Sequence, residues 1–422
     1  LVAVIGSSVS EKSGFLVALM ERFLGGAKGW IVSMVIIFLG INLNIAGDAG
    51  FIILPPLSAI LYMSIGRSPM LGLYVAFASV AAGFCANILL GLSDALAYGF
   101  TEAAAQMIDP NYSASIAINW YFLIVSCIIL TIAGTILTEK VMVHRFPVTK
   151  EELAQYDFDE DAANLSPVQK KGLKVAGIAF LVYLAVVLLL SLPIFGETAI
   201  LAGSDGTITA SDAPFTKGIV FTVTLALMIP GIAYGVAIGK YKNDKDVWAD
   251  ISQGFSEMGN YIFMCFFISI FTNFFSVSNL GTVLAITGAN GLQSIGFEGI
   301  PLMIGLIIVA CFVNLFIGSA SAKWAILAPV FVPMMMLMGY DPAITQAVYR
   351  IGDSITNPLS PLFTYMPVIL GYARKYDHKA GLGSVIANMI PFSVTFAIVW
   401  IIQVIVWVSL NLPLGPGGGI YL

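Results

Sequence analysis

The stretch that decides the fold is residues 300–338, IPLMIGLIIVACFVNLFIGSASAKWAILAPVFVPMMMLM. It is long enough to cross a bilayer twice, because one helical crossing needs about 20 mainly apolar residues. Small and polar residues interrupt it near the middle, in NLFIGSASAKW (314–324). Non-helical backbone is tolerated at membrane depth only where protein or a wet cavity surrounds it. The stretch therefore predicts a re-entrant hairpin, whose two helices enter and leave the bilayer on the same side.

A second stretch, 31–64, has the same design and is interrupted by INLNIAGDAG (41–50). The two stretches are also related in sequence, because residues 51–70 align with residues 324–343 without a gap. The identical pairs are Ile53/Ile326, Leu54/Leu327, Pro56/Pro329, Met63/Met336, Gly66/Gly339 and Pro69/Pro342. Apolar helices share aliphatic residues by chance, so the prolines and the glycine carry most of the weight. The alignment predicts two related units.

The composition of the whole chain indicates a membrane protein. Of its 422 residues, 59% are hydrophobic and 10% are charged, against about 45–50% and 25% in soluble proteins. The net charge of −5 comes without a dense basic patch, which argues against nucleic acid as a partner. The four cysteines lie in apolar stretches without metal-ligand spacing.

We expect an all-α polytopic protein with inverted repeats, each holding a re-entrant hairpin and a broken transmembrane helix. The seven spans that the sequence predicts are 69–92, 119–138, 174–195, 218–238, 257–275, 344–370 and 383–411. Two of these are interrupted, by GFCAN (83–87) and by GDSITNPLSP (352–361). Prolines in the second interruption remove backbone donors and free carbonyl groups. The expected parts are a first unit 1–138, an acidic cytoplasmic connector 139–173, a second unit 174–411 and a tail 412–422.

Loop charges predict which side of the membrane each loop faces, since short cytoplasmic loops are rich in Lys and Arg. The segments 139–174, 240–245 and 374–379 are basic and predicted to lie inside, whereas 93–118 and 196–217 are acidic and predicted to lie outside. The first hairpin, flanked by Lys28 and Arg67, then opens inward, and the second opens outward. Opposed repeats with discontinuous helices are typical of secondary transporters, whose binding site lies near the midplane.

Ionisable groups at membrane depth are costly and usually functional. Arg350 and Asp353 are three residues apart on one helix face, so they form either a self-neutralising pair or a site in which Arg350 binds a carboxylate and Asp353 a cation or proton. Asp94 ends its predicted span on the outward side, where it is either simply exposed or a gate for protons or sodium. In the second tip, Lys323 and Trp324 follow a small polar loop. The start of that half-helix suits an anionic group, and Trp324 either packs internally or stacks on an aromatic ligand.

Oxygen-bearing side chains at both tips suggest cation sites, because carbonyl, amide and carboxylate oxygens suit a hard cation such as sodium. The first hypothetical site comprises Asn42, Asn44, Asp48 and the 83–87 break. Its counterpart comprises Asn314, Ser319, Ser321, Thr356 and Asn357. Small residues for tight packing and Asp48 as a helix cap are the structural alternatives.

Two other classes of protein remain open at this point. A passive channel has less need of paired hairpins around a midplane site. An intramembrane hydrolase could use Ser321 with Lys323 as a Ser–Lys nucleophile, but the first tip has neither residue. The sequence has no HExxH zinc motif, and it has no GxxxxGK[ST] phosphate loop, which argues against ATP as the energy source.

Four runs of the sequence resemble the AbgT family of transporters for the folate breakdown product p-aminobenzoyl-glutamate. They are GINLNIAGDAGFIILPPL (40–57), NWYFLIVSCIIL (119–130), CFVNLFIGSASAKWAILAPVFVPMMMLMGY (311–340) and YRIGDSITNPLSP (349–361). The resemblance implies a homodimer in the bacterial inner membrane, without a cofactor except a sodium ion if sodium drives transport. It implies nine spans, and the seven predicted here would become nine if two lay ahead of Leu1. Some family members look like importers, and others are described as exporters that also remove sulfonamide drugs.

Carried over by resemblance, the functional positions of the family are Asp94, Asn314, Ser321, Trp324, Pro342, Arg350, Asp353 and Pro361. The run NPLSP (357–361) departs from the expected β-branched pattern, which affects the expected pocket shape and drug preference. p-Aminobenzoyl-glutamate has two carboxylates and a flat aniline ring. Arg350, the half-helix starts and Trp324 offer complementary groups.

Overall fold

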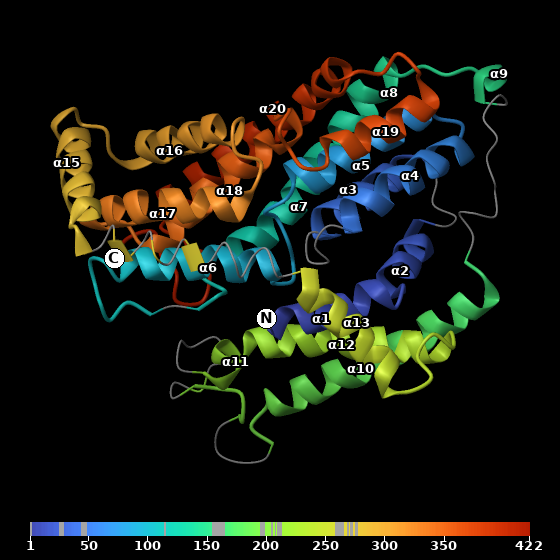
Figure 1. Cartoon of the computed structure of the whole chain (residues 1–422), viewed down its shortest axis with the longest axis horizontal. Coiled ribbons are helices and arrows are strands. Elements are labelled where there is room, and N and C mark those ends of the chain that lie inside the picture. Colours follow the sequence, from blue (N-terminus) through green and yellow to red (C-terminus); the bar gives the residue numbers. More distant parts are fainter. Residues whose placement is uncertain are drawn as a thin grey trace.

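The computed structural model describes residues 2–24, 29–43, 49–113, 115–153, 165–194, 199–203, 206, 208, 213–257, 266–267, 270, 273–274 and 277–422. Within these ranges the regular secondary structure is helical, apart from two isolated β-bridges. Figure 1 shows two groups of helices. The smaller group comprises α1 (Val2–Lys12), α2 (Phe15–Leu24), α10 (Pro167–Leu190), α11 (Pro214–Lys217), α12 (Ile219–Ala237) and α13 (Asp244–Glu257), with α12 packed on both α1 and α10.

The larger group holds both hairpins and both broken helices. Its helices are α3 (Trp30–Asn42), α4 (Ala49–Ser64), α5 (Pro69–Ala82), α6 (Leu92–Ala105), α7 (Trp120–Leu137), α8 (Val143–Arg145), α15 (Leu280–Ser294), α16 (Gly299–Asn314), α17 (Ala320–Leu337), α18 (Pro342–Thr356), α19 (Met366–Tyr376) and α20 (Leu382–Leu410). The short α9 (Lys150–Leu153) lies between the two groups in sequence. The main hydrophobic core draws on the first hairpin, α5, α7, α18 and α20.

The structure confirms the inverted repeats. The hairpin α3–α4 and the hairpin α16–α17 enter from opposite ends of the larger group, and their inner ends meet near its middle (Figure 1). The aligned glycines Gly66 and Gly339 both have positive φ, at 76° and 84°. The aligned prolines Pro69 and Pro342 both begin the helix that follows the hairpin. Proline suits this first helical position because its missing N–H would have no helical partner there.

Each broken helix is two helices joined by a non-helical connection. In the first repeat α5 ends at Ala82, and α6 begins at Leu92; in the second, α18 and a short 3-10 turn end at Leu359, and α19 begins at Met366. The segment 93–118, predicted to lie outside, is not a loop in its first part, which forms α6. The Asp94 side chain caps the first turn of this helix, because its Oδ2 accepts the backbone N–H of Gly91 at 2.6 Å.

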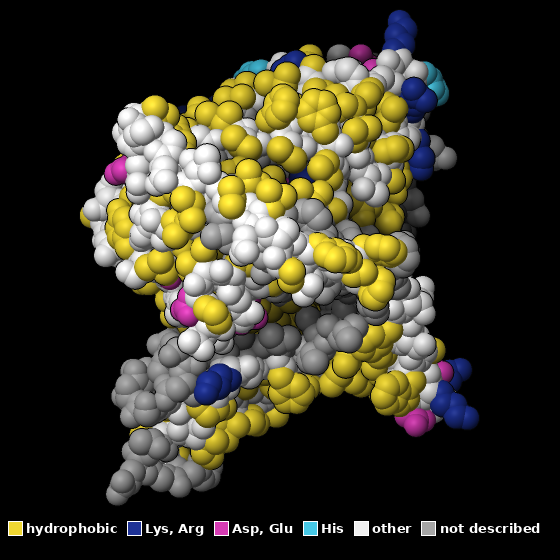
Figure 2. Space-filling view, turned by 60° about the vertical axis from the view of Figure 1, so that its left-hand side comes forward, with side chains coloured by type: hydrophobic (Ala, Val, Ile, Leu, Met, Phe, Trp, Pro, Cys, Tyr) yellow, Lys and Arg dark blue, Asp and Glu magenta, His cyan; other side chains and the backbone are white. Residues whose placement is uncertain are grey.

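Among the described residues, four helices are long and apolar enough to span a membrane: Trp120–Arg145, Pro167–Leu190, Ala320–Leu337 and Leu382–Leu410. The predicted spans 69–92 and 344–370 fall short of this length because each is broken, and most of 257–275 lies outside the described residues. Hydrophobic side chains cover much of the face in Figure 2, with Lys and Arg mostly near its edges. The protein is a multi-pass membrane protein.

The tail 412–422 is tied to the larger group by backbone hydrogen bonds. Phe122 N donates to Leu414 O at 3.1 Å, and Asp341 N donates to Ile420 O at 3.0 Å. Gly415 needs its missing side chain, since a Cβ there would lie 2.0 Å from Ala117 O. The tail therefore connects the start of α7 with the start of α18.

Candidate functional site

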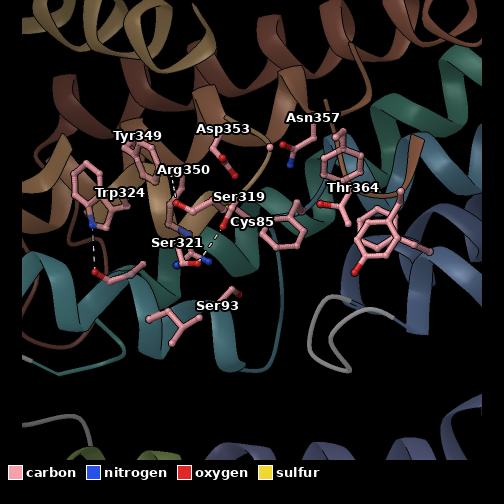
Figure 3. A pocket seen from close by; sticks show the side chains of 18 residues that line it. Cys85, Ser93, Ser319, Ser321, Trp324, Tyr349, Arg350, Asp353, Asn357 and Thr364 are labelled. Carbon is pink, nitrogen blue, oxygen red and sulfur yellow. Dashed lines mark hydrogen bonds between the residues drawn. The ribbon is translucent and has the colours of Figure 1, made fainter. Parts of the chain in front are cut away.

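A cavity of about 250 Å³ lies between the tip of the second hairpin and the two breaks. Its lining comes from both repeats: Phe51, Phe84, Cys85, Ser93, Leu96 and Ala97 from the first, and Gly318–Ser321, Trp324, Tyr349, Arg350, Asp353, Asn357 and Phe363–Tyr365 from the second. Figure 3 shows Trp324 and Tyr349 toward one end, Thr364 toward the other, and Arg350 and Asp353 between them. The cavity lies where opposed hairpins are expected to form a midplane site.

The tip of the second hairpin provides one wall of the cavity. The α17 helix begins at Ala320, and the hydroxyl of its N-cap Ser319 accepts the N–H of Ala322 at 3.4 Å. Gly318 lets the tip approach the second break, because a Cβ there would lie 2.5 Å from Leu362 O. The start of a helix presents backbone N–H groups and a partial positive charge, so this wall can bind an anionic group.

Arg350 forms an ion pair across the two repeats. Its Nη1 lies 2.7 Å from Asp94 Oδ1, and the two side chains are 3% and 1% exposed. Asp94 is also held by Asn87, whose Nδ2 donates to Oδ2 at 2.9 Å. The expectation that Asp94 could be exposed at a span end is wrong, because the broken helix turns it inward. Arg350 Nη2 has no hydrogen-bond partner within the described residues. This nitrogen is therefore a buried donor that a ligand could use.

The second buried ion pair joins Lys323 and Asp353. Lys323 Nζ lies 2.5 Å from Asp353 Oδ1, and both side chains are fully buried. The idea that Arg350 and Asp353 neutralise each other is therefore wrong. They share a helix, but each finds its partner on a neighbouring one, Arg350 on α6 and Asp353 on α17. Lys323 also donates to Asn314 Oδ1, which leaves it poorly placed to activate Ser321.

Two stacked aromatic pairs border the cavity. The rings of Trp324 and Tyr349 lie 4.3 Å apart at 20°, and those of Phe51 and Tyr365 lie 4.1 Å apart at 2°. The Tyr349 hydroxyl donates to Ala320 O at 2.6 Å, which connects α18 to the start of α17. Flat aromatic surfaces at these positions suit a planar ligand ring.

The structure brings six of the predicted site residues to the cavity: Ser319, Ser321, Trp324, Arg350, Asp353 and Asn357. Asp94, Asn314 and Thr356 lie directly behind this lining. Pro361 is exposed in the second break, and Pro342 lies at the far end of α18, so neither lines the cavity. Asn44 and Asp48 lie outside the described residues.

Asn42 and Asn314 have equivalent places in the two repeats. Each ends the first helix of its hairpin, and each bonds to the break of a broken helix. Asn42 Oδ1 accepts the N–H of Ile88 at 3.0 Å, whereas Asn314 Nδ2 lies 2.5 Å from Asp353 O and 3.0 Å from Asn357 Oδ1. In both repeats this asparagine ties the hairpin to the break.

The sequence did not point to several lining residues. Tyr349 and Cys85 are the clearest examples, since one precedes Arg350 and the other lies in the GFCAN break. Their positions next to recognised features are the only local signal. Within the described residues, no cluster of three or more His, Cys, Asp or Glu side chains is arranged to hold a metal ion.

Two inverted hairpins and two broken helices around a charged, aromatic-lined cavity form an architecture typical of membrane transporters. The family model of the AbgT putative transporter family matches residues 1–422. The chain therefore belongs to the AbgT family, as its four motif runs suggested.

Three relatives illustrate this membership. The chain is 34% identical to the p-aminobenzoyl-glutamate transport protein of Escherichia coli (strain K12), over 99% of this chain and 80% of that protein. The YdaH transporter of Alcanivorax borkumensis, whose crystal structure is described as having an unusual topology, matches with a TM-score of 0.89 and 34% identity, over 98% of this chain and 85% of that one. MtrF of Neisseria gonorrhoeae, described as illuminating a class of antimetabolite efflux pumps, matches with a TM-score of 0.89 and 36% identity, over 99% and 82%.

Proposed function

We propose that this transporter carries p-aminobenzoyl-glutamate across the bacterial inner membrane by secondary active transport. The observation that carries the proposal is the pairing, in one cavity, of the spare Nη2 of Arg350 with the Trp324–Tyr349 stack. A guanidinium binds carboxylates well, and the ring pair suits an aniline. The start of α17 offers a place for the second carboxylate. The name of the Escherichia coli relative supports the same substrate.

A sodium or proton gradient is the proposed source of energy. Thr356 Oγ1 and Asn357 Oδ1 are side-chain oxygens at the second break, where both accept from Asn314 Nδ2. Asp353, paired with Lys323, supplies a carboxylate in the cavity. Coupled ligands alter each other's affinity reciprocally, typically by about 1–3 kcal/mol. The coupling ion should therefore tighten substrate binding when the other ion is held constant.

The deciding experiment is flux of labelled p-aminobenzoyl-glutamate in proteoliposomes under a sodium or a proton gradient, each imposed alone. Accumulation above the equilibrium level with one gradient is expected, together with its loss in Arg350→Ala. A passive channel would give equilibration only. A Ser–Lys hydrolase would release cleaved product, and Ser321→Ala would abolish that release while sparing binding.

Sulfonamide export is a second proposed activity. Sulfonamides share the aniline ring, and the cavity has two stacked aromatic pairs that could receive it. The description of MtrF as one of a class of antimetabolite efflux pumps favours this reading. Drug tolerance of cells that express the parent or Trp324→Ala would test it, with lower tolerance expected for the variant.

A homodimer is proposed as the assembly. Of the 18 most apolar consecutive residues of α10, only 6% are buried within the chain. This helix therefore has apolar surface for lipid and for a second copy. Crosslinking between copies that carry single cysteines on α10 would test the assembly. Crosslinks that do not depend on protein-to-lipid ratio are expected for a stable dimer.

A further inference from the structure

A chain of buried hydrogen bonds runs from the cavity to the start of α18. Trp324 Nε1 donates to Thr101 Oγ1 at 2.8 Å, and Thr101 Oγ1 donates to Gln346 Oε1 at 2.6 Å. Gln346 Nε2 then donates to Asn119 Oδ1 at 2.7 Å. Finally, Asn119 Nδ2 donates to Ala343 O at 2.8 Å. The four polar side chains are at most 2% exposed.

The chain connects elements that are distant in sequence. Trp324 lies on α17 of the second hairpin, Thr101 on α6 of the first repeat, Gln346 on α18, and Asn119 just before α7. Buried polar groups are costly unless they are bonded, and a fully bonded network favours one arrangement of the side chains it joins. These bonds therefore fix the position of the Trp324 ring relative to both repeats.

The same bonds decide which part of Trp324 a ligand can meet. Its indole N–H is used by Thr101, with Ala97 O as a second acceptor at 3.2 Å. One ring face is covered by Tyr349. Trp324 still lines the cavity, so it offers carbon surface there and no hydrogen-bond donor. Such a surface favours an aromatic group over a polar one.

We propose that Thr101 and Gln346 are positioning residues that set the preference of this transporter for an aromatic ligand. Neither side chain lines the cavity, so both act through the Trp324 ring. The ligand part of this inference rests on the proposed function. The positioning part does not, because it concerns only how the indole is held.

The central experiment is a double-mutant cycle between Thr101 and Trp324. Thr101→Val keeps the shape and removes the hydroxyl, and we expect affinity for p-aminobenzoyl-glutamate to fall roughly three- to tenfold, the range for one net hydrogen bond. In a Trp324→Phe background the same change should have no further effect, because phenylalanine has no N–H to orient. Thr101→Ser should retain the parent affinity. An undiminished effect of Thr101→Val in the Trp324→Phe background would overturn the proposal.

Thr131→Val is the matched control. Thr131 is also buried, at 6% exposure, but its hydroxyl bonds within its own helix, to Cys127, whose backbone oxygen lies 2.7 Å away. We expect parent affinity for this variant. An equal loss for Thr131→Val and Thr101→Val would show that any buried hydroxyl matters, and would overturn a specific role for Thr101.

A ligand-free measurement separates this proposal from the proposed substrate. The fluorescence of Trp324, obtained as the difference between the parent and Trp324→Phe, should shift in Thr101→Val and stay unchanged in Thr131→Val. If Thr101→Val shifts the Trp324 fluorescence while the parent does not bind p-aminobenzoyl-glutamate, the result would reject that substrate and support the positioning role. An unchanged spectrum would overturn the positioning role. If Thr101→Val does not fold, Gln346→Met replaces it in the double-mutant cycle with Trp324→Phe. The expected outcomes are the same.

Discussion

The two repeats build the same framework but bring different chemistry to the cavity. The first repeat lines it with mostly apolar groups, namely Phe51, Phe84, Cys85, Ser93, Leu96 and Ala97. The second repeat brings Arg350, Asp353, Asn357 and the serines of its hairpin tip. The charge that the first repeat contributes, Asp94, stands behind the lining and pairs with Arg350.

This difference separates two tasks. Opposed hairpins and breaks are needed twice, because together they open the backbone at the middle of the membrane. Ligand recognition is needed once under the proposed function, and the charged and polar lining that would supply it lies mainly in the second repeat. The first repeat then serves as a wall and as a source of one countercharge. The following predictions test this division, starting with the largest effect.

The largest effect is expected at the ion pair that lies wholly within the second repeat. Lys323→Met leaves Asp353 as an unpaired buried charge and should cost about 3–5 kcal/mol of stability. Thermal unfolding of the purified protein measures this loss. Lys323→Met combined with Asp353→Asn should regain much of it, because no buried charge remains. A single variant as stable as the parent would contradict the pairing.

Arg350 should affect ligand binding more than Asp94 does. Arg350→Ala removes a charged hydrogen-bond donor from the cavity and should weaken p-aminobenzoyl-glutamate binding roughly 10- to 100-fold. Arg350→Lys should recover only part of this, since an ammonium lacks the fork geometry. Equilibrium binding to purified, folded protein is the measurement. Parent affinity in Arg350→Ala would remove the anchor role.

For Asp94, the countercharge of Arg350, we expect a substitution to lower stability but not ligand binding. Asp94→Asn should destabilise the protein by about 2–3 kcal/mol, because Arg350 loses its charged partner. Binding of an anionic ligand should stay at least as strong, since the ligand carboxylate can then neutralise Arg350. A loss of binding equal to that of Arg350→Ala would show that the first repeat contributes recognition directly.

The sequence predicted the framework more fully than the partners within it. Proline, glycine and polar residues inside long apolar stretches have local consequences for the backbone, which is why both hairpins and both breaks were found. The partner of Arg350 was missed, since Asp94 lies in the other repeat, in a segment judged from its loop charges. Thr101 and Gln346 were missed for the same reason: their bond joins residues 245 positions apart, and each alone is an ordinary buried polar residue.

A smaller effect is expected at the helix starts, where the repeats also differ. The aligned N-cap residues are Ser68 before α5, whose side chain makes no capping bond, and Asp341 before α18, whose Oδ1 accepts the N–H of Ala343 at 2.7 Å. Burial raises the pKa of the Asp341 carboxyl to about 6, although the backbone N–H groups of Ala343 and Gly419 lower it. The folded protein therefore disfavours ionised Asp341.

The sign of the pH dependence follows from this raised pKa. Below about pH 3 the carboxyl is protonated in both the folded and the unfolded chain, so no penalty exists. As the pH rises to 6 and above, the unfolded chain ionises more easily, and stability should fall by about 1–2 kcal/mol. Asp341→Asn should flatten this part of the profile in thermal unfolding between pH 4 and 7. An unchanged profile would mean that other groups produce it.

The smallest effect is expected at the base of the first hairpin, where the first repeat has an ion pair of its own. Arg67, after α4, binds both oxygens of Glu139 at 2.6 and 2.7 Å. Glu139 lies in a π-helical turn, Thr138–Met142, that continues α7. Ser33 of α3 donates to the same carboxylate at 2.6 Å. These contacts fasten the hairpin base to α7.

This pair differs from the cavity pairs in exposure, since its side chains are 20% and 21% exposed and those of Lys323 and Asp353 are fully buried. Water and salt screen partly exposed charges, so a cycle of Arg67→Met and Glu139→Gln should give a coupling of about 0.5–1 kcal/mol. The coupling should shrink in high salt, whereas the Lys323–Asp353 coupling should not. A coupling at the hairpin base that is as large as the buried one, and independent of salt, would break the comparison. The first repeat would then depend on its charges as strongly as the second, and the division between a framework repeat and a recognition repeat would have to rest on the cavity lining alone.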